Sequence, residues 1–400
     1  MTTQESNLQG TQNPDSNEAP RAGARGRNRI VAALLSRSTV LTAAALLLIL
    51  YFQDVSGGLF LTSSNASLLL RQTAVVAVVA SGMAMLIIMG EIDLSVGSAA
   101  FFTGLVVANC QVAGWGLMLS ILAGLAVGLI LGLIHGLVVT RFGVPAFIVT
   151  LAGFLLWRGL GLLLSNATPV GPVDNDLINI TEGRMPTPLV YVLALAVLGA
   201  GAWRAVAARK RIQGSGRLAA LITPVAASLV VAAIVIIMGQ TPTGLPNALL
   251  WITGIALVFG TMLGRAKLGR RIFLLGSNAE AAVYAGINAK RTVLIGFLVM
   301  GAIYGIAGTM LTARAGVASP DAGINLELTA IAAAVIGGTS LRGGIGSVRG
   351  AILGAFLLAT TDNGMSLLGV PSYSQNVVKA IILVVAVALD GYFRRRQVVK

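Results

Sequence analysis

Long stretches without a charged residue dominate the chain. The longest of these stretches are Gln72–Gly90, Leu94–Ile134, Met185–Trp203, Leu218–Gly264 and Thr292–Ala313. A helix needs about 20 apolar residues to cross the hydrocarbon core of a bilayer. Transmembrane strands would instead alternate apolar and polar residues over about ten positions. Because the stretches are continuously apolar, the pattern predicts an all-α polytopic membrane protein.

We expect about 12 transmembrane helices (roughly 10–12), some of them short or broken. The predicted spans cover residues 39–60, 68–90, 95–113, 115–140, 145–164, 188–208, 218–238, 246–264, 292–312, 326–341, 345–361 and 374–392. The last three are short and are interrupted by Gly337-Gly338, Gly343-Gly344 and Gly346. Broken helices are tolerated where the backbone lines a water-filled path. Residues 1–36 are expected to form a disordered basic tail, and residues 37–393 a membrane domain with a cytoplasmic loop at 265–291.

Basic residues gather at alternate ends of the predicted spans. The chain has a net charge of +14, from 28 Lys plus Arg against 14 Asp plus Glu. If the N-terminus is cytoplasmic, the cytoplasmic loops carry Arg141, Arg204, Arg209, Lys210, Arg211, Arg217, Arg265, Lys267, Arg270, Arg271, Lys290, Arg291, Arg342, Arg349 and Arg394–Arg396. The outer loop Ser165–Thr187 is mildly acidic. Basic residues mark cytoplasmic loops, so both termini are predicted to be cytoplasmic and nucleic acid is not an expected partner.

Several chemistries lack the residues they need. Cys110 is the only cysteine and His135 the only histidine, so no disulfide, usual metal site or Ser-His-Asp arrangement is expected. Both residues are interpreted as packed side chains. No Gly-Lys dipeptide occurs, so the chain lacks the phosphate-binding loop that ATP hydrolysis would require. The sequence therefore predicts neither an enzyme nor a bound cofactor.

The predicted cytoplasmic loop contains a pattern typical of a short helix. Gly276 and Ser277-Asn278 predict a turn followed by a helix cap. A helix over residues 279–285 is then expected to end at Gly286. Such a helix, with a face of small residues, suits docking into a groove of another protein. A simple linker between two spans is the alternative.

The loop and three further stretches resemble one known family. Gly276-Ser-Asn-x-x-Ala-Ala-x-x-x-Gly-Ile287 resembles the coupling segment of the ribose- and xylose-type permeases of ATP-binding-cassette importers. The stretches Glu91–Ser98, Pro145–Leu151 with Arg158-Gly159, and Ala330–Gly346 resemble three other segments of that family in the same order. Glu91 departs from the glycine that is more usual there. An additional pair of spans near residues 205–245 resembles the xylose and multiple-sugar branch.

This resemblance implies a permease subunit in the inner membrane of a bacterium, importing xylose or a related monosaccharide. It implies three partners: a separate ATPase with two fused modules, an extracytoplasmic sugar-binding protein and a second permease copy. It also implies that the ATPase is contacted by Gly276, Ser277, Asn278, Ala281, Ala282, Gly286 and Ile287. A permease for another small polar solute, a secondary transporter and a membrane enzyme are the alternatives. A secondary transporter would need ion-binding groups near the midplane, and acidic residues within the spans are few.

Polar residues in or near the spans are candidates for the translocation pathway. They are Asp93, Ser95, Arg158, Thr339, Ser340 and Asn363. Asp93 is alternatively a cap of the third span. Arg158 is expected to pair with an acid, to contact sugar hydroxyls or to extend to the interface. Glu327, Asp362 and Asn363 are predicted at outer ends of short spans, where they contact a partner or sugar, or are simply solvated.

Overall fold

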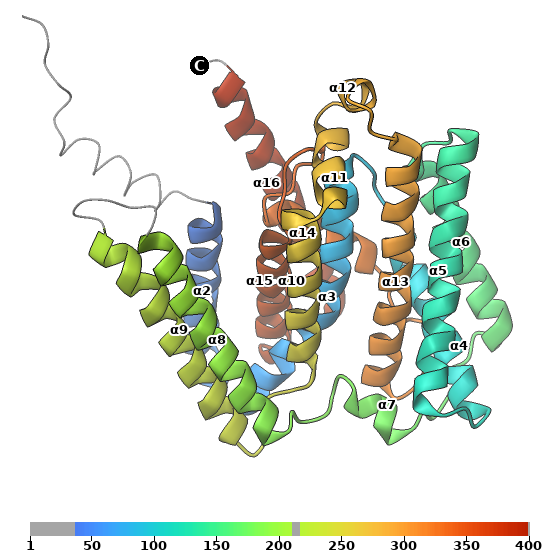
Figure 1. The fold of residues 1–400 in the computed structure, drawn as a ribbon. Coiled ribbons are helices and arrows are strands. Elements are labelled where there is room, and N and C mark those ends of the chain that lie inside the picture. The colour runs from blue at the N-terminus through green and yellow to red at the C-terminus, as the bar shows by residue number, and fades with distance from the viewer. Residues whose placement is uncertain (1–36, 210–216, 399–400) are drawn as a thin grey trace, which may run out of the picture.

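The computed structural model describes residues 37–209 and 217–398, which form helices joined by loops and contain no strand (Figure 1). The predicted spans correspond in order to α2 (Arg37–Val55), α3 (Ser63–Met89), α4 (Val96–Val112), α5 (Leu117–Phe142), α6 (Ala146–Ser165), α8 (Thr187–Arg209), α9 (Arg217–Gln240), α10 (Ala248–Arg265), α13 (Ala289–Ala315), α14 (Leu326–Ile336), α15 (Val348–Leu367) and α16 (Ser372–Val398). The shorter α7 (Asn175–Asn179), α11 (Lys267–Ser277) and α12 (Ala279–Tyr284) lie between them. The all-α prediction is confirmed, and the predicted tail at 1–36 lies outside the described residues.

The helices differ in how well each could cross a membrane alone. Within the described residues, 7 helices are long and apolar enough: α3, α5, α6, α8, α9, α10 and α13. Helices α2, α4, α14 and α16 contain shorter apolar stretches. Helix α14 ends at Ile336, where the sequence predicted a span to residue 341, and the chain turns through 337–347 before α15. This break agrees with the expected short or interrupted spans.

Helix α3 forms the centre of the molecule. Its side chains from Thr73 to Met89 are almost all buried, and α10, α11, α13, α14 and α15 pack around it. Many of those side chains are Ala, Val, Gly or Ser, which allow neighbouring helices to approach closely. The helices around α3 therefore share one core rather than forming separate bundles.

Helices α5 and α13 lie side by side with their backbones in contact (Figure 1). A side-chain carbon built on Gly132 would lie 2.8 Å from the Cα of Gly301. Small residues let membrane helices associate through van der Waals contact, because lipid offers no hydrophobic drive toward association. The α5–α13 pair therefore fixes α13, which carries part of the polar network described below.

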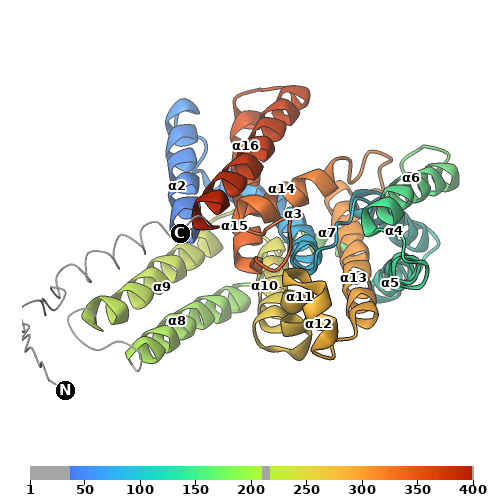
Figure 2. The same ribbon diagram turned by 90° about the horizontal axis from the view of Figure 1, so that it is seen from above.

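Helices α8 and α9 form a hairpin at the edge of the molecule (Figure 2). At the end of the hairpin that lies toward α7, Met185 and Leu245 pack with Leu70 of α3 and Leu249 of α10. The remaining length presents apolar side chains such as Leu195 and Leu229 outward, as expected for lipid contact. This hairpin corresponds to the additional pair of spans in the sequence.

The ends of the bundle carry different loops. Helix α12 lies at the same end as the C-terminal part of α16, and α7 lies at the opposite end (Figure 1). The basic loop around α12 and the mildly acidic loop around α7 are therefore separated by the full length of the spans.

Candidate functional site

The loop between α10 and α13 begins with a helix that the sequence analysis missed. Gly276 and Ser277 were predicted to form a turn, but they occupy the last turn of α11. Ile272 and Leu275 face the core, whereas Arg270 and Arg271 are exposed. The apolar residues recur at helical spacing, a signal hidden by the high charge of the segment.

Helix α12 has defined caps at both ends. The Asn278 side chain accepts the backbone N–H of Ala281 at 2.9 Å. At the other end, the N–H of Gly286 bonds to Val283 at 2.9 Å and that of Ile287 to Ala282 at 3.0 Å, with φ of Gly286 at +80°. This pair of bonds around a left-handed glycine is the Schellman motif. The predicted short helix is thus present and ends one residue earlier than expected.

The predicted coupling residues differ in accessibility. Ala282 is buried and Ile287 packs against the core, whereas Ala281 and Gly286 are exposed. The largest exposed side chain of α12 is Tyr284, with 91% of its surface accessible, and Val283 beside it is 54% accessible. The sequence analysis named the small residues and missed these two, although a tyrosine in an alanine-rich polar loop was a visible signal.

Gly276 joins α11 to two other segments. A side-chain carbon there would overlap the carbonyl oxygen of Ile88, at the end of α3, and would lie 2.8 Å from the Gly344 nitrogen. The Gly344 N–H in turn bonds to the Ile88 carbonyl at 2.8 Å. We call this contact of α3, α11 and residues 337–347 the glycine junction. It places the end of α11 in direct backbone contact with the central helix α3.

Asp93 lies at the centre of a buried hydrogen-bond network. The backbone N–H and the hydroxyl of Ser95 both donate to Asp93 Oδ1 at 2.7 Å, and the Tyr304 hydroxyl donates to Oδ2. Ser95 is itself the N-cap residue of α4, so Asp93 shapes the turn before the helix rather than capping its first amide groups. The network ties the 90–95 loop to α13.

His135 continues the network toward α6. Trp157 Nε1–H donates to His135 Nε2 at 3.0 Å, and His135 Nδ1 lies 3.3 Å from the Tyr304 hydroxyl oxygen. His135 Nε2 accepts the Trp157 proton, and the Tyr304 hydroxyl gives its proton to Asp93. The neutral imidazole is therefore assigned the tautomer with its proton on Nδ1, which donates to the Tyr304 hydroxyl oxygen. The expectation of a packed polar histidine is confirmed, and its contacts join three helices: α5, which carries His135, α6 and α13.

Arg158 holds a segment that folds back into the bundle. Its Nη1 donates to the carbonyls of Pro320 at 2.8 Å and Ala322 at 2.9 Å, and its guanidinium lies 4.8 Å from the centre of the Phe101 ring. These carbonyl contacts were not among the roles predicted from the sequence. The segment 316–325 thereby enters the bundle and packs at Gly97, in the first turn of α4.

Of the residues predicted at outer ends, Glu327 and Asn363 are buried and Asp362 is half-buried. Glu327 is 6% exposed and Asn363 1% exposed. Asn363 exchanges two amide hydrogen bonds with Asn65 of α3, at 2.8 and 3.0 Å. Asp362 forms an ion pair of 3.1 Å with Lys379 of α16. The solvated alternative is wrong for Glu327 because the segment before α14 folds inward, and for Asn363 because α15 continues to Leu367 and packs against α3.

Thr339 and Ser340 are also buried, each 1% exposed. The Ser340 N–H bonds to the Ile345 carbonyl at 2.9 Å and closes the loop after α14. The predicted pathway residues thus lie in several parts of the bundle. The described residues bring together no group of His, Cys, Asp and Glu that could hold a metal ion.

The polytopic helical bundle, with a capped short helix in one loop and a broken span, has the architecture of a membrane permease. The family described as "Branched-chain amino acid transport system / permease component" matches residues 65–387, and the chain belongs to it. The predicted membership in the ribose- and xylose-type permeases is confirmed by its relatives.

The xylose transport system permease protein XylH of Escherichia coli K12 is 41% identical over 331 residues, covering 81% of this chain and 84% of the relative. XylH of Haemophilus influenzae is 39% identical, over 80% of this chain and 86% of the relative. The ribose import permease protein RbsC of Escherichia coli K12 is 34% identical, over 80% and 83% of the respective chains. No solved structure matches.

Proposed function

We propose that the protein is the permease subunit of a bacterial importer of xylose or a related monosaccharide, driven by a separate ATPase. The observation that carries this proposal is the 41% identity to a xylose permease over 331 residues. The 34% identity to a ribose permease supports a pentose in particular. The family description also names branched-chain amino acids, so an amino acid is the second candidate.

The coupling role falls to the segment Gly276–Ile287. An ATPase groove would receive the exposed face of α12, with Ala281 and Gly286 allowing close approach and Tyr284 filling a pocket. Tyrosine is enriched among residues that dominate binding energy at interfaces. Displacement of α12 would pass through the glycine junction to α3 and to residues 337–347. These two segments lead into the polar network and the broken span, so the path could open at either end.

The remaining partners follow from the same proposal. A second copy of the chain would complete the path, the ATPase would carry two fused modules, and a sugar-binding protein would dock at the end that carries α7. The predicted pathway residues Asp93, Ser95 and Arg158 would shape the path by holding the 90–95 and 316–325 segments. Thr339, Ser340 and Asn363 would do the same for the broken span.

Substitution at Tyr284 tests the coupling role. Tyr284→Ala removes a side chain that is almost fully exposed, so the fold should persist while the ATPase contact weakens. Loss of an interface anchor typically costs about 2 kcal/mol or more, which is roughly 30-fold in affinity. Co-purification of the ATPase and sugar-stimulated ATP hydrolysis would measure the loss, with the exposed Glu280→Gln as control. Unchanged assembly and hydrolysis in Tyr284→Ala and in the bulkier Ala281→Trp would make α12 a linker.

Labelling tests the proposed orientation, in which both termini are cytoplasmic and the α7 loop is outside. Asn175 is exposed at the start of α7. In a Cys110→Ala background, Asn175→Cys should react with an impermeant thiol reagent in spheroplasts. Labelling only in inverted vesicles would reverse the topology.

A further inference from the structure

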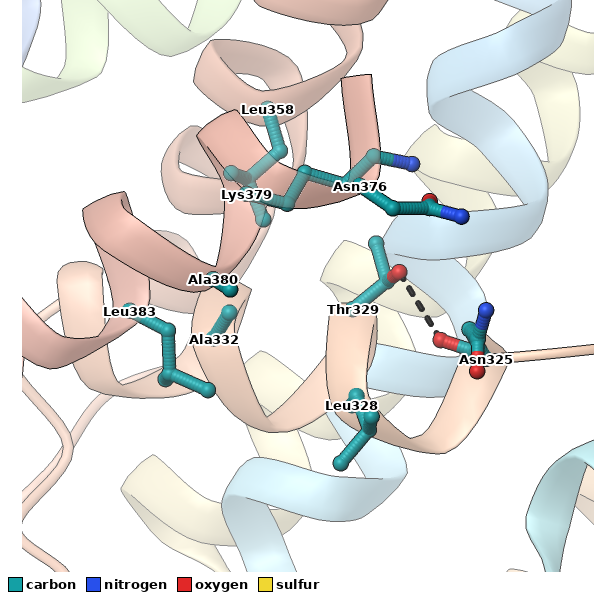
Figure 3. Close-up of a pocket in the computed structure, with 9 residues that line it drawn as sticks. All are labelled: Asn325, Leu328, Thr329, Ala332, Leu358, Asn376, Lys379, Ala380 and Leu383. Atoms are coloured by element: carbon teal, nitrogen blue, oxygen red, sulfur yellow. Dashed lines mark hydrogen bonds between the residues drawn. The ribbon is translucent and has the colours of Figure 1, made fainter. Parts of the chain in front are cut away.

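A cavity of about 260 Å³ lies between α14, α15 and α16 (Figure 3). It is lined by Asn325, Leu328, Thr329, Ala332, Leu358, Asn376, Lys379, Ala380 and Leu383. Asn325 precedes α14 and Asn376 lies near the start of α16, whereas Leu358 lies midway along α15. The cavity therefore extends from the N-terminal ends of α14 and α16 toward the middle of the bundle. None of the residues predicted from the sequence lines it.

The lining combines the groups that recognise a polyol. Asn325 and Asn376 supply amides and Lys379 an ammonium group, while the Thr329 hydroxyl donates to the Asn325 carbonyl at 2.9 Å and keeps its lone pairs as acceptors. Figure 3 shows these polar ends together, with Ala332 and Leu383 away from them. The Lys379 ammonium bonds to Asp362 at 3.1 Å, which leaves two of its three donors free. Amides both donate and accept, as sugar hydroxyls do.

Two of these groups are unpaired and exposed. The side chains of Asn325 and Asn376 have no hydrogen-bond partner among the described residues, and both are exposed. Both amides can therefore donate to and accept from water or a polar ligand in the cavity.

The size of the cavity limits the ligand. Pockets for drug-sized molecules have volumes of about 300–1,000 Å³. A cavity of about 260 Å³ suits a smaller molecule of the size of one sugar ring. It is open on one side, at the exposed Asn325, Leu328 and Asn376, so that a ligand would be held weakly.

We propose that this cavity is a transit subsite for a monosaccharide, with Asn325, Thr329, Asn376 and Lys379 bonding its hydroxyl groups. The proposal rests on the proposed function as a sugar permease. Weak binding suits the site, because a transported molecule must leave as readily as it arrives.

Cysteine reactivity tests whether the cavity is wet and takes sugar. In a Cys110→Ala parent, Asn376→Cys is compared with Val377→Cys, whose exposed side chain is adjacent in sequence but does not line the cavity. A charged thiol reagent applied to the permease assembled with its ATPase should modify Asn376→Cys at least about tenfold faster, because thiolates form in water and not in lipid. D-xylose in the millimolar range should slow this reaction, and L-leucine should not.

Each other result has a definite meaning. Equal, slow reaction at both cysteines would show that lipid or a second copy fills the cavity, and would overturn the proposal. Fast reaction without protection by D-xylose, in a parent that transports D-xylose, would show a wet cavity that is not a sugar subsite. A parent without ATP-dependent D-xylose uptake would instead refute the proposed function itself, and the sugar subsite with it.

Transport gives a second readout. Asn376→Leu should lower the rate of D-xylose uptake by about fivefold, the value of one hydrogen bond, while Val377→Leu leaves it unchanged. Because Asn376 is exposed and unpaired, the stability of the variant should match that of the parent. Normal uptake in Asn376→Leu would contradict a role in recognition.

Discussion

Replacing Gly276 by alanine should test how much the glycine junction contributes to stability and to coupling. The new methyl group would overlap the Ile88 carbonyl oxygen and approach the Gly344 nitrogen to 2.8 Å. Since both atoms belong to backbone, neither can move as a flexible side chain would. The hydrogen bond of 2.8 Å between Gly344 and Ile88 would be strained or lost.

The expected cost follows from those contacts. Overpacking in a closely packed site costs about 1–3 kcal/mol. Leaving a buried hydrogen bond unmade costs roughly a further 1–3 kcal/mol. Alanine recovers up to about 1 kcal/mol of helix propensity relative to glycine. Because one displacement produces both losses, they do not add fully, and we expect a net loss of roughly 1–4 kcal/mol.

Gly264→Ala is the matched control, since no atom lies within 4 Å of a side-chain carbon built there, in α10 close to α11. Thermal unfolding of the purified protein would measure stability, and sugar-stimulated ATP hydrolysis would measure coupling. Gly276→Ala should reduce both, and Gly264→Ala neither. If Gly276→Ala unfolded at the control's temperature with normal hydrolysis, the glycine junction would carry neither packing nor coupling.

Two further changes test the buried network and the loop beside it. Tyr304→Phe removes the hydroxyl that donates to Asp93 and should destabilise the protein by roughly 1–3 kcal/mol in thermal unfolding, whereas the exposed Tyr373→Phe should not; equal stability would show the network to be redundant. Burial raises the pKa of Glu91, in the 90–95 loop, from 4.5 to about 7. The folded protein therefore binds the extra proton between these values, and its stability should fall as pH rises from about 4.5 to 7. Glu91→Gln should remove this fall, so that the variant gains most at pH 8 and little near pH 4.5; parallel unfolding profiles would contradict the assignment.

The sequence predicted the spans well because lipid imposes a simple requirement. Every backbone polar group within the bilayer must be paired inside its own segment, so long apolar stretches become helices. The cap at Asn278 and the end at Gly286 were predictable for a similar reason, since both depend on local backbone chemistry.

The site was harder to predict because its contacts are distant in sequence. Tyr304 meets Asp93 across 211 positions, and Asn363 meets Asn65 across 298. No local pattern shows that the 316–325 segment folds inward or that α15 packs its last turns against α3, so Glu327 and Asn363 were misplaced. Lys379 and Asn376 line a cavity only because α16 packs beside α14, and this contact is not visible in the sequence.

Uptake by the reconstituted system tests the central claim most directly. The permease would be placed in proteoliposomes with its ATPase and its sugar-binding protein, and labelled D-xylose, D-ribose and L-leucine would be compared with and without ATP. The account predicts ATP-dependent accumulation of a pentose, with none in liposomes lacking the permease. Accumulation of L-leucine alone, or pentose uptake that needs an ion gradient rather than ATP, would contradict it.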